Sequence, residues 1–160
     1  MRDGCPALAF ANRLRLMEQH LTQVGADVIG MSEIDGVGGD QPQAHVDLVK
    51  LMKKLGYDFQ IFEKPSGLSA SGVFFKKDKL SLVSSKYDAY TPGASQGYVQ
   101  CVFALKSKPD FQFVFCETHM KAKPANMADR VHSVKVLQAD FSANHQDKPV
   151  FVAGDFNEEP

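Results

Sequence analysis

Several features that would assign a protein class at once are missing from this sequence of 160 residues. It has no run of about 18 consecutive apolar residues, so we expect no transmembrane helix. Its net charge is only −1, so we do not expect a nucleic-acid binder that is basic throughout, although a local basic patch is allowed. The segment Met1–Leu8 has one basic residue and no long apolar core, which does not fit a signal peptide.

Cysteine is scarce as well, and the residues present are Cys5, Cys101 and Cys116. An odd number without paired spacing argues against a disulfide framework, and no CxxC pair or His/Cys cluster suggests zinc. Cys101 and Cys116 lie within apolar runs, where a free thiol usually acts as a small hydrophobic side chain. We therefore expect three free thiols and an intracellular, reducing compartment, with the cytoplasm favoured.

The remaining composition is that of one globular domain. With 44% hydrophobic and 23% charged residues, the chain is long enough to bury a core of ordinary size. Intrinsic disorder, collagen and coiled coil are excluded as descriptions of the whole chain. Internal repeats and low-complexity linkers are also absent from the sequence.

Apolar residues recur at three- and four-residue steps in three segments, which predicts helices. These segments are 11–24, 43–55 and 128–144. The residues that we expect on the inward face of the third helix are Val131, Val134, Leu137 and Phe141. Short apolar or alternating runs predict single strands at 28–33, 57–61 and 149–153.

Two pairs of apolar segments are separated by turn residues, which predicts two hairpins. The first pair is 72–76 and 80–84, and the second is 98–105 and 111–118, around a turn at 108–110. Helices are thus mixed with hairpins, which fits neither a purely parallel α/β fold nor an all-β sandwich. We predict an α/β fold, a layered α/β sandwich with mixed β-sheets.

Four residues able to bind a cation or a phosphate stand where buried strands are predicted to end. They are Glu33, His119, Asp155 and Asn157. Open α/β sheets bind ligands at such strand ends, so the four side chains could converge on one edge. Oxygen ligands without cysteine favour magnesium or manganese over zinc, and the same groups could instead position a phosphate. Each residue alone also has an ordinary structural explanation, such as a solvated cap, a turn or a surface histidine.

Three strings around these residues resemble the endonuclease/exonuclease/phosphatase superfamily. They are ADVIGMSEID at 26–35, THMKAK at 118–123 and GDFNEEP at 154–160. All three occur in the family order, and their form is most similar to nocturnin and the carbon-catabolite-repressor-type deadenylases. Arg130, eleven residues after His119, also matches that branch. The resemblance implies a DNase-I-like αββα fold.

The resemblance also implies a role for each matching residue. Glu33 would bind a divalent ion, Mg²⁺ or Mn²⁺. His119 would contact the scissile phosphate, Asp155 would help to orient the attacking water, and Asn157 would contact the phosphate. Two further candidate phosphate ligands are Lys121 and Arg130. Phosphoryl transfer needs mainly positive charge on the phosphate oxygens and an aligned water, which this set could supply.

The activity that the resemblance implies is a magnesium-dependent phosphohydrolase or phosphodiesterase. Its substrate would be an RNA 3′ end, such as poly(A), or an adenine dinucleotide phosphate, and no protein partner is indicated. One alternative is a non-catalytic relative that acts as a binding or scaffold protein, and another is a lipid or sugar-phosphate phosphatase. Tyr90 and Tyr98 are candidates for stacking on a base, with core packing as their other role.

The sequence also departs from the family pattern. Family members begin with a strand that carries an asparagine of the metal site, and they end with an SDH motif; neither is found here. Ser32 stands where the family usually has glutamine beside the metal-binding glutamate. We therefore expect residues 1–160 to be a partial domain, incomplete at both ends, with little activity alone.

Overall fold

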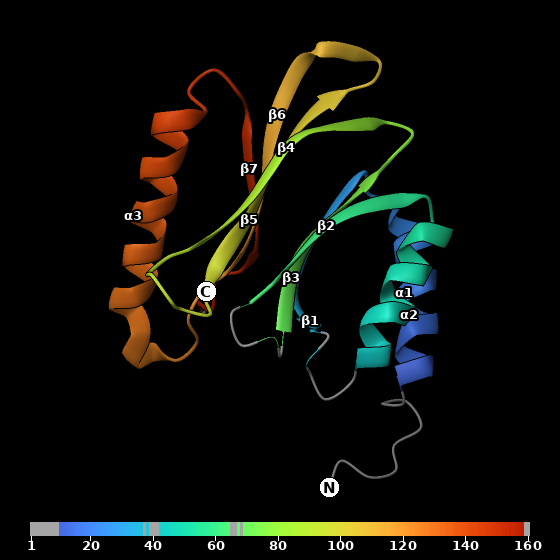
Figure 1. Ribbon diagram of the computed structural model, residues 1–160, viewed down its shortest axis with the longest axis horizontal. Coiled ribbons are helices and arrows are strands. Elements are labelled where there is room, and N and C mark those ends of the chain that lie inside the picture. The colour runs from blue at the N-terminus through green and yellow to red at the C-terminus, as the bar shows by residue number, and fades with distance from the viewer. Residues whose placement is uncertain (1–9, 37, 39–41, 65–66, 68, 159–160) are drawn as a thin grey trace, which may run out of the picture.

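Two β-sheets pack face to face, and helices cover their outer faces (Figure 1). This arrangement is seen in a computed structural model, which describes residues 10–36, 38, 42–64, 67 and 69–158. The predicted layered α/β sandwich with mixed sheets is therefore confirmed. No helix among these residues is long and apolar enough to cross a membrane.

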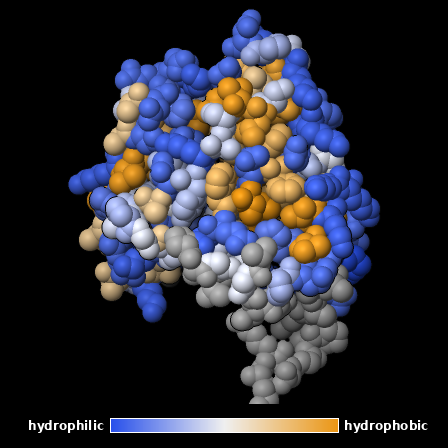
Figure 2. Space-filling view, viewed as in Figure 1, coloured by the Kyte–Doolittle hydropathy of each residue, from blue (hydrophilic) through white to orange (hydrophobic). Residues whose placement is uncertain are grey.

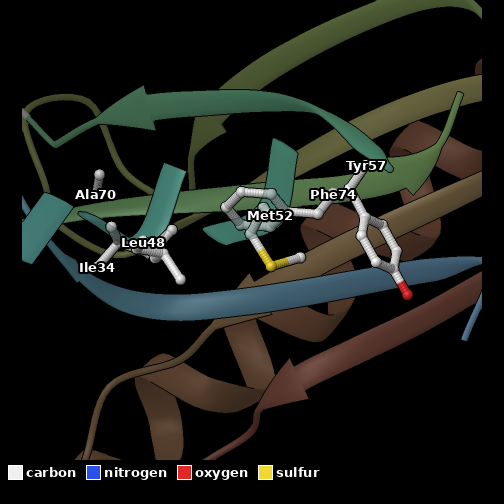
Figure 3. Close-up of a cluster of buried hydrophobic side chains, with 6 residues drawn as sticks. All are labelled: Ile34, Leu48, Met52, Tyr57, Ala70 and Phe74. Carbon is white, nitrogen blue, oxygen red and sulfur yellow. The ribbon is translucent and has the colours of Figure 1, made fainter. Parts of the chain in front are cut away.

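The first sheet is antiparallel and has the strand order β1–β3–β2. Its strands are β1 (Val28–Asp35), β2 (Tyr57–Glu63) and β3 (Ser69–Lys76). Two helices, α1 (Phe10–Val24) and α2 (Pro42–Lys54), lie against its outer face (Figure 1). Figure 3 shows how Leu48 and Met52 of α2 pack against side chains of this sheet. The apolar stripe of α2 thus buries the outer face of the first sheet.

The second sheet has the order β4–β5–β6–β7. Its strands are β4 (Leu80–Ala89), β5 (Gly97–Leu105), β6 (Lys108–His119) and β7 (Val150–Asp155). The first two pairs are antiparallel, whereas β6 and β7 are parallel. A parallel pair needs a long crossover, and the short 3₁₀ helix η2 (Pro124–Asn126) and α3 (Met127–Asn144) supply it.

An apolar core fills the space between the sheets. Phe75 of β3 meets Phe103 of β5 with ring centroids 4.9 Å apart, and Val73 and Val99 are fully buried. Both β3 and β5 are central strands that are buried along almost their whole length. Figure 2 shows apolar residues gathered over the sheets in the middle of this face, with mostly hydrophilic residues over the outer helices.

The first predicted hairpin is wrong, because its two strands belong to different sheets. β3 is flanked by β1 on one side and β2 on the other, so neither of its edges is open to β4. The turn at Lys77–Lys79 instead carries the chain from one sheet to the other. Turn residues between two apolar runs predict a reversal of direction, but they do not predict whether the two runs pair.

The second predicted hairpin is confirmed, but its turn lies earlier than expected. Leu105 pairs with Lys108, so the chain reverses at residues 106 and 107. The predicted turn at 108–110 belongs to β6, where a shift in register between Ala104 and Leu105 accommodates the extra residues. This part of β6 tolerates Pro109 because a bulge there removes the need for a backbone N–H donor.

The inward face of α3 also differs from the prediction. Leu137 is buried and Phe141 packs beside it, as expected, but Val131 and Val134 are 48% and 41% exposed. The helix instead buries Arg130 and Ser133. The guanidinium of Arg130 is tied to backbone carbonyls of the loop before the helix, which turns this face inward.

The cysteines follow the prediction where the structure describes them. Cys101 and Cys116 are buried free thiols. Burial raises the pKa of Cys101 to about 12 and also raises that of Cys116. Cys5 lies outside the described residues.

Gly154 of β7 provides a test of the close β6–β7 pairing. It has φ +145°, and a Cβ there would lie 1.9 Å from the carbonyl oxygen of Thr118. Gly93 is a matched control, because its φ is +78° and a Cβ there would meet nothing within 4 Å. We expect Gly93→Ala to cost about 1 kcal/mol of unfolding free energy, and Gly154→Ala about 1–3 kcal/mol more, in urea denaturation. Equal losses would contradict this packing.

Candidate active site

The parallel pairing of β6 and β7 brings the first candidate residues together. In the register of these strands, His119 lies beside Asp155 and Thr118 beside Gly154. Beyond the strands, the backbone N–H of Met120 donates to the carbonyl of Asp155 at 2.8 Å. The side-chain amide of Asn157 donates to the carbonyl of Met120, also at 2.8 Å. His119, Asp155 and Asn157 are therefore held at one end of the second sheet.

Glu33 reaches the same end from the first sheet through a β-bulge. Met31 pairs with Gly72 and Ile34 with Ala70, so Ser32 and Glu33 together face the single residue Ser71. Glu33 has φ +55° and is exposed. Burial lowers the pKa of the His119 imidazole, and the carboxylates of Glu33 and Asp155 both lie close enough to oppose that shift. Bulges re-aim side chains in this way and are common next to active sites.

A lysine that the sequence reasoning missed contacts this histidine. Lys64 directly follows β2 and is only 6% exposed. Its Nζ lies 3.2 Å from Nδ1 of His119. Burial and the Lys64 charge lower the pKa of His119, whereas Glu33 and Asp155 oppose that shift. Burial also lowers the pKa of Lys64, and the charges of Glu117 and Glu33 oppose it.

A second missed residue, Glu117, is a fully buried carboxyl group between the sheets. The Ser32 hydroxyl donates to its Oε1, while its Oε2 has no hydrogen-bond partner among the described residues. Burial raises the pKa of Glu117 to about 7, against the opposing effects of the Ser32 and Ser71 hydroxyls and Lys64. A Cβ at Gly30 would lie 2.9 Å from Cγ of Glu117, so the glycine leaves room for this side chain.

Both missed residues carried a signal in the sequence. Glu117 is a charged residue inside the apolar run that ends at His119, and a charge in a buried strand is rare unless it is paired. Lys64 lies three residues beyond the predicted strand at 57–61, whereas Glu33 ends its predicted strand. Neither belongs to the three strings that carry the family resemblance, so the resemblance assigns no role to either residue.

The two basic candidates, Lys121 and Arg130, are engaged elsewhere. Lys121 is exposed and its Nζ forms an ion pair with Asp129 at 2.8 Å. Arg130 is buried, with Nε donating to Glu158 at 2.6 Å and Nη1 to the carbonyl of Lys123 at 2.8 Å. These contacts shape the loop that follows His119, and they leave a phosphate-binding role for either side chain a prediction.

The two tyrosines considered for base stacking are core residues. Tyr90 and Tyr98 are 6% and 2% exposed, and their rings contact each other with centroids 5.6 Å apart. The hydroxyl of Tyr90 is hydrogen-bonded to that of Thr118. Their rings support the strand that carries His119, and they are too buried to stack on a base in this arrangement.

The donor groups at this end suit a cation that needs few protein ligands. Among the residues that the structure describes, no group of three or more His, Cys, Asp or Glu side chains is arranged to hold a metal ion. Mg²⁺ keeps several of its waters and usually takes only one or two carboxylates together with substrate phosphate oxygens. The exposed carboxylate of Glu33 fits that requirement.

The sequence matches the Endonuclease/Exonuclease/phosphatase family over residues 3–160. The chain therefore belongs to this family, and the resemblance noted from its three strings is confirmed.

This chain matches three relatives over only part of each relative's length. A probable RNA exonuclease of Schizosaccharomyces pombe is 26% identical over 165 residues, which cover 96% of this chain and 32% of the exonuclease. The human nocturnin catalytic domain with bound sulfate has a TM-score of 0.77 and 25% identity, covering 96% of this chain and 59% of that domain. ANGEL2, a 2′,3′-cyclic phosphatase, has a TM-score of 0.82 and 18% identity, covering 97% of this chain and 46% of that protein.

Glu117 predicts a particular pH dependence of stability. Its pKa rises from an ordinary 4.5 to about 7 on folding, so the stability it contributes is full below about pH 4.5 and is lost as the pH rises through about 7. Glu117→Gln removes this ionisation. We expect the melting temperature of the variant, relative to the unchanged protein, to increase steadily between about pH 5 and about pH 8.

The control for this experiment is Asp110→Asn, at an exposed position of β6. Its melting temperature relative to the unchanged protein should stay flat over the same range. If the Glu117→Gln difference is also flat, the carboxyl group is not buried as described.

Proposed function

We propose that this protein is a magnesium-dependent phosphoric ester hydrolase whose phosphate-binding centre includes Glu33, His119, Asp155 and Asn157. The observation that carries the proposal is the convergence of Glu33, from the bulge of β1, with the β6–β7 register pair of His119 and Asp155. Membership of the Endonuclease/Exonuclease/phosphatase family supports the same reaction class.

Glu33 would hold Mg²⁺, and a bound Mg²⁺ would supply positive charge that polarises the phosphate. His119 would donate to a phosphate oxygen, because its ring lies half-buried at the centre of the site. The backbone N–H of Asn157 donates to Oδ1 of Asp155 at 2.9 Å, which orients the carboxylate. Asp155 would then accept a proton from the attacking water through its other oxygen.

Asn157 would complete the phosphate contacts. One N–H of its amide is occupied by the carbonyl of Met120, which fixes the amide plane. The second N–H of the same group would donate to a phosphate oxygen. Donors held in place before the reaction stabilise the developing charge more effectively than mobile ones.

The substrate class that we propose is the 3′ end of an RNA, with an adenine dinucleotide phosphate as the second candidate. The similarity to an RNA exonuclease and to the nocturnin domain supports a nucleotide substrate. The chain spans about a third of the exonuclease and three fifths of the nocturnin domain. Because Tyr90 and Tyr98 are buried, a base would be recognised by other residues.

The test is hydrolysis of oligo(A) by the full-length natural protein with Mg²⁺ and with EDTA. We expect Glu33→Ala, His119→Ala and Asp155→Asn each to lower kcat by about 10²–10⁴-fold. Lys79→Met is the control, since this exposed residue pairs with Asp27 at the turn between β3 and β4. It should leave kcat unchanged. Hydrolysis that persists in EDTA, or that survives all three substitutions, would contradict the proposal.

A further inference from the structure

The contact between Lys64 and His119 joins the two sheets at the proposed active site. Lys64 follows the last residue of β2 in the first sheet, and His119 ends β6 in the second. The lysine is buried, so its ammonium group interacts with neighbouring protein groups more than with solvent. Its Nζ lies 3.2 Å from Nδ1 of the imidazole, which is hydrogen-bond distance.

The chemistry of the two groups decides which one donates. An ammonium group has three N–H donors and no acceptor, so the ring nitrogen that faces it must be the acceptor. In a neutral imidazole only one nitrogen carries a proton. If Nδ1 accepts from Lys64, the ring proton is on Nε2, on the side of the ring that faces away from the lysine.

The charges around this pair favour the same arrangement. Glu117 and Glu33 lie close enough to stabilise the ammonium form of Lys64 against the effect of burial. The positive charge of Lys64 disfavours a second positive charge on His119, although Glu33 and Asp155 act in the opposite direction. A charged lysine beside a neutral histidine is therefore the arrangement that the surrounding groups support.

We propose that Lys64 is a positioning residue, which holds His119 as the neutral tautomer with its proton on Nε2. This inference rests on the proposed function and assigns the roles within it. His119 presents an N–H donor to the phosphate and takes no proton from the water, because its other nitrogen is occupied by Lys64. The proton of the attacking water then passes to Asp155 while the water oxygen bonds to phosphorus. The ester P–O bond breaks, and the leaving oxygen takes a proton from solvent. Lys64 itself acts through the ring and is not required to touch the substrate.

The first test is NMR of the full-length natural protein labelled with ¹⁵N at histidine, without substrate. His119→Gln identifies the signals of this ring. In the unchanged protein we expect the coupling pattern and shifts of the Nε2–H tautomer at neutral pH, with a titration midpoint below the ordinary value for histidine. A ring found as the Nδ1–H tautomer would overturn the proposal.

Lys64→Met removes the donor and keeps the length of the side chain. We expect a mixture of tautomers and a higher titration midpoint for His119, and Lys64→Arg should restore the Nε2–H form. Lys79→Met, which removes an exposed positive charge at the turn between β3 and β4, should change neither the tautomer nor the titration midpoint of His119. An unchanged His119 in Lys64→Met would overturn the proposal. If that variant fails to fold, the tautomer of the unchanged protein and of Lys64→Arg still decides.

Kinetics separate this inference from the proposed function. We expect Lys64→Met to lower kcat by about 10–100-fold, the range for losing a group that orients an active-site histidine, and Lys64→Arg to recover most of it. A protein that shows the Nε2–H tautomer but no hydrolysis would refute the function and leave the Lys64 contact intact. Hydrolysis with the Nδ1–H tautomer would do the reverse.

Discussion

The parallel pairing of β6 with β7 is the constraint on which the site depends. It sets His119 beside Asp155 without any direct bond between their side chains. The same ladder continues through the loop, where Met120 bonds to Asp155 and Asn157 bonds to Met120. A parallel pair requires a crossover, which α3 supplies. The buried Arg130 near the start of this helix binds the carbonyl of Lys123 and so shapes the loop after His119. A slip of one residue in this register would separate the polar groups.

Charged groups buried between the sheets add a second constraint. Glu117 and His119 belong to the second sheet, whereas Ser32 belongs to the first and Lys64 directly follows its strand β2. Each contact between them crosses the sandwich, so these polar pairs tie the two sheets together at the end where the site lies. Burying a carboxylate and an ammonium costs free energy, and such groups are weak contributors to stability. Their value here is to fix how one sheet lies over the other.

Part of this arrangement could be predicted from the sequence, because local patterns carry it. The three helices, the family and the choice of Glu33, His119 and Asp155 as candidate site residues all follow from short strings and periodicity. The rest depends on partners distant in the chain. The separation of β3 from β4 arises because β1 and β2 already flank β3, and no property of the turn reveals that. The contact of Lys64 with His119 joins residues 55 positions apart.

The proposed function requires Glu33 to bind a cation beside His119 and Asp155. Paramagnetic broadening by Mn²⁺ tests it most directly, since the broadening falls steeply with distance from the ion. Added in small amounts to the ¹⁵N-labelled full-length protein, Mn²⁺ should first broaden the amide signals of Ser32, Glu33, His119 and Asp155. Glu33→Ala should abolish that selective loss. Broadening centred elsewhere, or the same pattern in Glu33→Ala, would contradict the account.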